Sequence, residues 1–179
     1  AFRGPVESGL MKMITIGLGK QKGAEAAHQY SFKYMARHVV DMAKIVIQKA
    51  PIIFGVAVLE NAYDRPAKIV TVPAEQFETV EPELLIEAKS LMPRIMFNPI
   101  DVLVVDEIGK DISGDGMDPN ITGRYATPYA SGGPDIARIV VLGLSEKTDG
   151  NANGIGLADI TTKKVKEQII WEKGYANAL

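Results

Sequence analysis

The sequence predicts an α/β protein, in which short strands alternate with helices. Four apolar runs rich in β-branched residues, at 52–59, 68–72, 101–106 and 138–144, have the length and composition of strands. A helical pattern separates the second run from the third, and glycine-rich loops follow the third and the fourth. Because ligands gather at the carboxyl ends of strands in such sheets, we expect mixed or parallel sheets flanked by helices, with a ligand cleft at the strand ends between two domains.

The clearest helix is expected over residues 31–50. Its apolar residues recur every three or four positions and form one stripe, which consists of Phe32, Met35, Ala36, Val39, Met42, Ala43, Val46 and Ile47. Ser31 is a suitable N-cap, and Pro51 ends the helix by disfavouring helical geometry at the residue before it. His38 falls outside the centre of the stripe and is predicted to be a surface or edge histidine.

Two more helices are predicted further along the chain. One begins at Glu81, because Pro82 suits a first helical turn and acidic residues complement the helix dipole there. Pro93 closes this helix. The other helix is expected over roughly 159–171, after a glycine-rich turn.

The strands differ in their expected neighbours. Residues 52–59 are almost continuously apolar, which is typical of a strand buried on both faces. A turn at 64–66 leads into 68–72 as the neighbouring strand, which Pro73 stops. The run 101–106 is predicted to be another buried strand, with an acidic residue at its carboxyl end.

Two long loops follow strands and are expected to share one crevice, at 107–134 and 145–156. A loop as long as the first is usually functional or else disordered. It opens with three carboxylates and a lysine at 106–111, which suit either a divalent cation or a solvated loop whose acids cap turns. In the second loop, the glycines of 150–156 suit a phosphate cradle at the start of the following helix. A domain boundary is placed near 93–100.

Composition narrows the classes of partner. The 179 residues are 46% hydrophobic and 23% charged, which is ordinary for a globular protein. A net charge of −2 does not indicate the excess of basic residues that is typical of nucleic-acid-binding proteins. The chain has no cysteine, which excludes disulfides and thiolate metal sites within it and fits the cytoplasm. No apolar run reaches the roughly 18–20 residues of a membrane span.

The most informative stretch of the sequence runs from Glu7 to His28. Ser8-Gly9 can bring backbone N–H groups close to a ligand, since Gly9 has no Cβ. Lys12 follows among apolar residues, where partial burial would lower the pKa of its amine and make it nucleophilic. Glycines at 17, 19 and 23 are expected to break any long helix and to redirect the chain toward His28, a potential metal ligand. The alternative is a short amphipathic helix, a loop and a second helix, with solvated side chains.

Ser8-Gly9-Leu10-Met11-Lys12, with His28 after it, resembles the core of the nickel-pincer-nucleotide-dependent lactate racemase family. Four further segments resemble one branch of this family, and the similarity spans essentially the whole chain: 2–5, 17–21, 106–110 and 154–159. The resemblance implies that 1–95 is the end of an N-terminal cofactor-binding domain and that 96–179 is part of a second domain. It also implies a central fragment of a longer polypeptide, because relatives continue in both directions.

The resemblance implies the chemistry of a racemase or epimerase for a small 2-hydroxy acid. Lys12 would carry the nickel-pincer nucleotide covalently through a thioamide, with Ser8 and Gly9 beside it, and His28 would be the nickel ligand from the protein. Hydride would leave the substrate carbon and return to its opposite face. The family's general base is a histidine that precedes the motif, and the chain has none before His28. The base is therefore expected upstream of Ala1 or replaced.

In the resembled family, a lysine from the second domain helps to orient the substrate carboxylate and the ring of the cofactor. Lys110 is our candidate for this role, and Arg124 is the second. Leu10 and Met11 stand where many members carry smaller residues, so the substrate is not assumed to be lactate. Proteins that load the cofactor are expected partners, and nucleic acid and membranes are not. The alternative function is a non-catalytic nucleotide- or metal-binding protein that has kept the fold.

Overall fold

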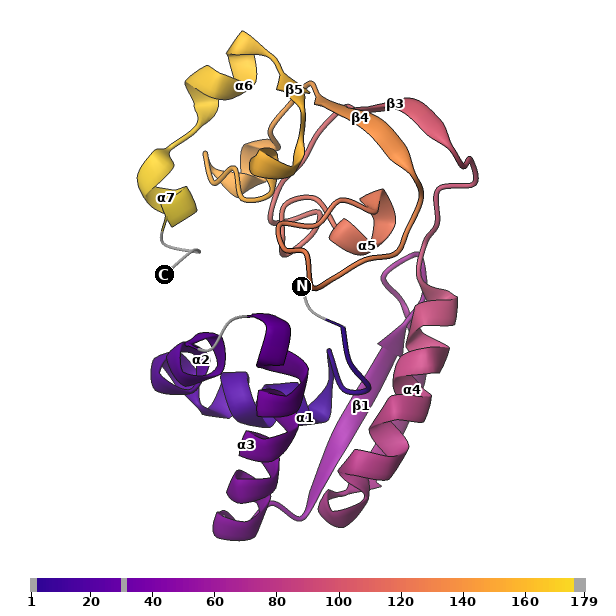
Figure 1. Ribbon diagram of the computed structural model, residues 1–179, viewed down its shortest axis with the longest axis vertical. Helices are drawn as coiled ribbons and strands as arrows, with labels where there is room; N and C mark the ends of the chain where they lie inside the picture. Colours follow the sequence, from indigo (N-terminus) through magenta and orange to yellow (C-terminus); the bar gives the residue numbers. More distant parts are fainter. Residues whose placement is uncertain (1–2, 30–31, 176–179) are drawn as a thin grey trace. The chain divides into compact units, whose positions relative to one another are not determined.

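The computed structural model describes residues 3–29 and 32–175, which fall into two compact units, Ala1–Pro93 (unit 1) and Arg94–Leu179 (unit 2) (Figure 1). Unit 1 contains an antiparallel pair of strands, and unit 2 contains a three-stranded parallel sheet. Helices flank the strands, so the predicted mixed α/β class is confirmed. The assignment of 1–95 and 96–179 to parts of two family domains stays a prediction.

The motif segment is helical almost throughout. It consists of α1 (Leu10–Lys12), a π-helical turn η1 (Met13–Leu18) and α2 (Lys20–His28). Breaks were expected at three glycines, but the helix is interrupted at one place, where Lys20 has a positive φ of 53°. Gly19 and Gly23 instead let two helical turns approach, because a Cβ on either would lie 2.1 or 2.4 Å from the Thr15 carbonyl oxygen. The expected break is therefore present beside Gly19, whereas the chain stays helical at Gly17 and Gly23.

The long helix α3 (Met35–Lys49) follows a single 3₁₀ turn, η2 (Phe32–Tyr34). Its predicted stripe is correct from Met35 onward, since Met35, Val39 and Ala43 are buried in the core of unit 1. Phe32, the first residue of the predicted stripe, lies in η2 and is 37% exposed. The helix ends where Ala50 becomes extended before Pro51, as the sequence indicated. Ser31, the expected N-cap, lies outside the described residues.

Strand β1 (Phe54–Glu60) pairs antiparallel with β2 (Pro66–Pro73). Leu59 and Val72 point into the core, while Phe54, Val56 and Val58 are 49–52% exposed. The expectation of a strand buried on both faces is therefore wrong. An apolar run lacks the alternation that would reveal which face is covered, and in unit 1 α1 and α4 pack against β1.

Helix α4 (Phe77–Leu91) begins four residues before Glu81, after the 3₁₀ turn η3 (Ala74–Gln76), so the predicted start is wrong. The buried ring of Phe77 anchors the true start in the core. Pro82 lies inside the helix, where its missing N–H removes one backbone hydrogen bond. The predicted end is correct, since Met92 is extended before Pro93.

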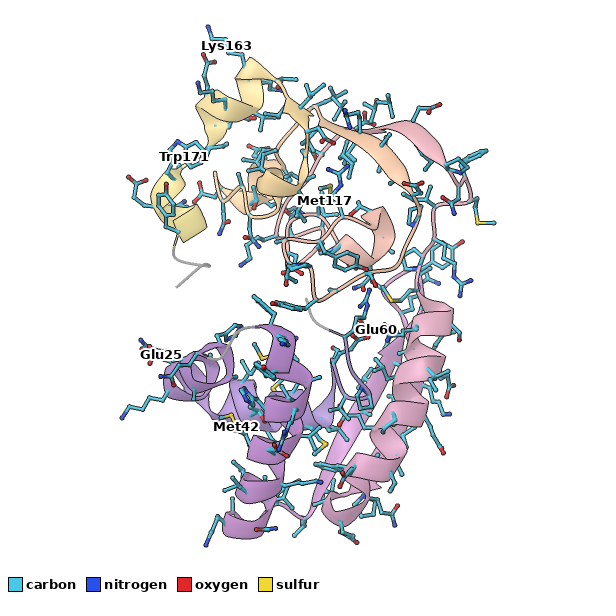
Figure 2. The ribbon with its side chains drawn as sticks, viewed as in Figure 1. Glu25, Met42, Glu60, Met117, Lys163 and Trp171 are labelled. Atoms are coloured by element: carbon cyan, nitrogen blue, oxygen red, sulfur yellow. The ribbon has the colours of Figure 1, made fainter. Side chains whose placement is uncertain are left out.

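The sheet of unit 2 has the order β3 (Ile100–Val105), β4 (Ile136–Val141), β5 (Ile160–Thr161), and all its pairs are parallel. Its core is built largely from loops: the buried Ile108, Leu144 and Ala152 pack with Met117, which Figure 2 places among the loops. The prediction of a buried strand over 101–106 is wrong, because β3 is an edge strand in which Val102 and Val104 are 53% exposed.

No single helix spans 159–171. Strand β5 comes first, followed by α6 (Lys163–Gln168) and α7 (Trp171–Tyr175), each beginning at a residue that Figure 2 labels. The Thr162 hydroxyl accepts the Val165 N–H and caps α6, which starts the helix late. The Ile170 N–H donates to the Gly150 carbonyl at 2.9 Å, which separates α6 from α7. The shorter elements of unit 2 are α5 (Pro119–Thr122), η4 (Glu146–Thr148) and η5 (Ile155–Leu157).

The two faces of β1 give a direct stability test. Truncation of the buried Leu59 to alanine leaves a cavity and is expected to cost about 2–5 kcal/mol of unfolding free energy. Val58→Thr, at the adjacent half-exposed position, should stay within about 0.5 kcal/mol. Chemical denaturation followed by circular dichroism measures both. Equal losses in the two variants would contradict the one-sided burial of this strand.

Candidate functional site

The motif turn begins at Gly9, which is the N-cap of α1 and has φ 145° and ψ −146°. This positive φ favours glycine, because L side chains rarely adopt it. The Gly9 carbonyl accepts the Met13 N–H at 2.9 Å and starts the helix. Ser8 and Gly9 are exposed, and Lys12 is half-buried at the end of α1. The turn therefore fixes the backbone directly before Lys12.

A carboxylate from α4 lies against this turn. The Glu81 side chain is only 3% exposed, and its Oε2 accepts the Met11 N–H at 2.9 Å. Its Oε1 has no hydrogen-bond partner among the described residues and would lie 2.6 Å from a Cβ placed on Gly9. The Glu81 side chain therefore occupies the space on the Cβ side of Gly9. Contact of Ser8 and Gly9 with a cofactor stays a prediction.

Sequence reasoning assigned Glu81 to the start of a helix and missed this role. The spacing contains a signal that would have found it. Glu81 precedes Leu84 by three residues and Leu85 by four, so it belongs to the apolar stripe of α4 and to the core-facing side. A carboxylate on a core-facing stripe needs a partner, because burial without one is costly.

Burial raises the pKa of the Glu81 carboxyl to about 7, and hydrogen bonds from the backbone N–H groups of Met11 and Leu10 oppose this rise. The raised value means that the folded protein binds the proton of Glu81 more tightly than the unfolded chain does. This contribution to stability is present at acidic pH and is lost as the pH rises through about 7.

Helix α4 contacts the motif segment at a second point. The Lys89 amine forms an ion pair with the buried Glu7 carboxylate, and Arg3 pairs with the same carboxylate at 3.4 Å. Glu7 immediately precedes the Ser8-Gly9 turn. The segment that carries Lys12 is thus attached to one helix both before and after Gly9.

His28 is the last residue of α2 and is exposed. Its Nδ1 lies 2.6 Å from the Ala24 carbonyl oxygen, and its ring forms a T-shaped pair with that of Phe32, with centroids 5.6 Å apart. A carbonyl oxygen only accepts, so Nδ1 is the donor in this contact, which does not involve Nε2. The other histidine, His38, is half-buried on α3 and stacks on Tyr34 at 6.2 Å.

Lys12 and His28 both belong to unit 1, and the π-helical turn η1 lies between their helices. Helix α2 packs against η1 and α3. Turns of π-helix are rare and occur frequently at functional sites. The convergence of the Lys12 and His28 side chains on one cavity stays a prediction.

The two candidate cations of unit 2 differ in their surroundings. The Lys110 side chain is exposed, while its backbone N–H donates to Thr148 Oγ1 at 3.1 Å. The Arg124 guanidinium donates to Asp159 Oδ2 at 3.1 Å and to the Ile136 carbonyl at 3.2 Å. Arg124 therefore links the loop 107–134 to the sheet, which is a structural task.

The two glycine-rich loops lie together, as expected from their positions after strands. The Ser145 hydroxyl donates to Asp111 across them, and a Cβ on Gly116 would lie 1.6 Å from the Asn153 carbonyl oxygen. The predicted phosphate cradle at 150–156 is corrected in one respect: strand β5 follows the loop and η5, so there is no helix start of the expected kind.

Two features are absent from the described ranges, 3–29 and 32–175. No group of three or more His, Asp or Glu side chains could hold a metal ion there. No helix in these ranges has both the length and the apolar character needed to cross a membrane.

Comparison with known proteins adds no relative: no protein-family model, no curated protein and no solved structure matches this chain. The resemblance to the nickel-pincer racemase family therefore stays a prediction, based on the motif residues of the chain.

The Arg124–Asp159 pair gives a pH prediction. The Ile139 N–H, at 2.8 Å, and the Arg124 guanidinium lower the pKa of Asp159. Its contribution to stability is therefore present above the unfolded value of about 4 and is lost as the pH falls below it. We expect Asp159→Asn to flatten the acid limb of the unfolding profile below about pH 4.

The unfolding profile is measured by tryptophan fluorescence. Trp171 is the single tryptophan of the chain and belongs to unit 2, so its emission reports on this unit. Asp101→Asn, at an exposed position on β3, is the matched control and should leave the acid limb unchanged. An Asp159→Asn profile identical to that of the unmutated chain would show that the pair does not stabilise unit 2.

Proposed function

We propose that this chain is part of an isomerase, a racemase or epimerase of a small 2-hydroxy acid, that works with a covalently bound nickel-pincer nucleotide. The motif Ser8-Gly9…Lys12…His28 suggests this class. The proposal includes a substrate cleft at the carboxyl ends of strands, cofactor-loading proteins as partners and a cytoplasmic location.

The contact between His28 Nδ1 and the Ala24 carbonyl is the observation that carries the proposal. A histidine that binds a metal usually donates its other ring N–H to a carbonyl or carboxylate, which orients the ring. The contact between Nδ1 and the Ala24 carbonyl meets this requirement, and Nε2 is then the ring atom that would bind the metal. An imidazole nitrogen suits square-planar Ni(II). The exposed ring also leaves space for a metal complex that brings its other ligands with it.

Lys12 would hold the organic part of the cofactor through its amine. The position suits this task, since Lys12 ends a helical turn whose backbone Gly9 and Glu81 fix, and its side chain is half-buried. Ser8 and Gly9 are exposed beside it and would contact the cofactor. When bound, the nickel-pincer nucleotide supplies a reversible acceptor for the hydride of the substrate.

The residues of unit 2 would handle the substrate. We propose that Lys110 holds the substrate carboxylate as a point charge, since its side chain is exposed at the surface of the loop. Arg124 is the weaker candidate, because its guanidinium donates to three acceptors within unit 2: Asp159, Leu157 and Ile136.

Metal and mass analysis of the purified chain test the proposal. His28→Ala should lose nickel but keep the added mass on the Lys12 peptide, because the covalent bond does not involve the imidazole. Lys12→Ala should lose both. Elemental analysis and peptide mass spectrometry, on protein purified from a host that makes the cofactor, measure the two quantities.

His38→Ala is the matched control, since it removes the other histidine of the chain and should keep nickel and mass. Wild-type nickel content in His28→Ala would overturn the ligand assignment. Nickel without any added mass on Lys12 would instead indicate the non-catalytic metal-binding alternative.

A kinetic prediction concerns Lys110. Removal of a charged hydrogen-bond donor from a substrate carboxylate costs about 1.5–3 kcal/mol, so Lys110→Ala should raise KM for a hydroxy acid by roughly 10- to 100-fold. Lys147→Ala, an exposed lysine in the other loop, is the control and should leave KM unchanged. An unchanged KM in Lys110→Ala would remove this lysine from substrate binding.

A further inference from the structure

Glu81 is a buried carboxyl group for which the proposed chemistry has no use. Its side chain reaches from α4 to the first turn of the motif helix, 70 residues earlier in the chain, and bonds the Met11 N–H at 2.9 Å. The first N–H groups of a helix have no partner within the helix, so this acceptor satisfies a group that would otherwise be buried without one.

Met11 determines where Lys12 points. The Met11 side chain is 1% exposed and packs in the core of unit 1, and Lys12 is the next residue on the same turn. Any displacement of the Met11 backbone therefore displaces Lys12. Ile14 is also buried, which fixes the following turn. The hydrogen bond to Glu81 thus acts on the part of the backbone that orients the lysine.

Gly9 and Glu81 fit each other closely. A Cβ at Gly9 would lie 2.6 Å from Glu81 Oε1, so the carboxyl occupies the space that a side chain would need. The ion pair between Lys89 and Glu7 holds the chain directly before this contact. Two residues of α4, eight positions apart, therefore fix the segment from Glu7 to Met11.

We propose that Glu81 is a positioning residue for Lys12: its carboxyl holds the segment Ser8–Lys12 in the conformation that presents the lysine amine for covalent attachment of the cofactor. The role of Lys12 in this inference rests on the proposed function, whereas the contact with Glu81 does not. Burial raises the pKa of this carboxyl to about 7, although the backbone N–H groups of Met11 and Leu10 lower it.

Three variants of the whole chain test the inference. Glu81→Gln keeps an oxygen that accepts the Met11 N–H, and Glu81→Leu fills the same space without an acceptor. Glu83→Leu makes the same change at an exposed glutamate of α4, two residues away, and is the matched control. Hydrogen exchange of the amides of 10–18 is measured, with those of α3 as the internal reference. The occupancy of Lys12 is measured by peptide mass.

We expect Glu81→Leu to speed exchange of the amides of 10–18 by about tenfold or more, with α3 unchanged, since a hydrogen bond to a charged or polar acceptor is lost. Occupancy of Lys12 should fall in the same variant. Glu81→Gln should restore both to near the wild-type values, and Glu83→Leu should change neither. A general loss of stability would speed amide exchange in α3 as well. An effect confined to the amides of 10–18 and to the occupancy of Lys12 therefore distinguishes positioning from a merely structural role.

Unchanged exchange and unchanged Lys12 occupancy in Glu81→Leu would overturn the inference, as would a failure of Glu81→Gln to restore them. If Glu81→Leu does not fold, Glu81→Ala decides by the same two measurements, because it removes the acceptor without introducing a larger group. A wild-type chain that carries no added mass on Lys12 would contradict the proposed function alone, and the exchange result would still decide the role of Glu81.

Discussion

The hydrogen bond between the Glu81 carboxylate and the Met11 N–H is the interaction on which the organisation of unit 1 depends. It joins the helix α4 to a helical turn far away in sequence, and it does so with a charged or protonated group inside a core of methionine, valine and phenylalanine side chains. A buried polar contact of this kind tolerates few alternatives, because the loss of either partner leaves the other unsatisfied. The apolar packing around it supplies stability, and the hydrogen bond selects one backbone arrangement.

Unit 2 is held together in a different way, by hydrogen bonds that fix its loops. Its sheet is small, and loops provide much of the core, so side chains and backbone groups must hold the loops in place. Arg124 does this with three acceptors, and Asp159 does it by accepting both the arginine and the Ile139 N–H. Polar residues in these loops therefore have structural tasks, although a search for sequence motifs would assign them catalytic or binding roles.

The sequence predicted the elements whose signals are local. The stripe of Met35, Val39 and Ala43 and the stop at Pro51 gave α3 correctly, since both depend on neighbouring residues only. The exposure of Val56 was not predictable, because an apolar run is the same whether one face or both are covered. The division of 159–171 into a strand and two helices depends on contacts with Ile139 and Gly150, which lie elsewhere in the chain.

The π-helical turn Met13–Leu18 has a consequence for the geometry of the site. A π-turn closes i→i+5 hydrogen bonds and so contains one residue more than an ordinary helical turn. Deletion of that surplus residue would restore an α-helix and rotate the residues from there to Leu18 by about 100° around the axis of this helix. The direction in which the chain enters the interruption at Lys20, and from there α2 with His28, thus depends on one inserted residue. A homologue with or without it would present its imidazole in a different direction from the same lysine.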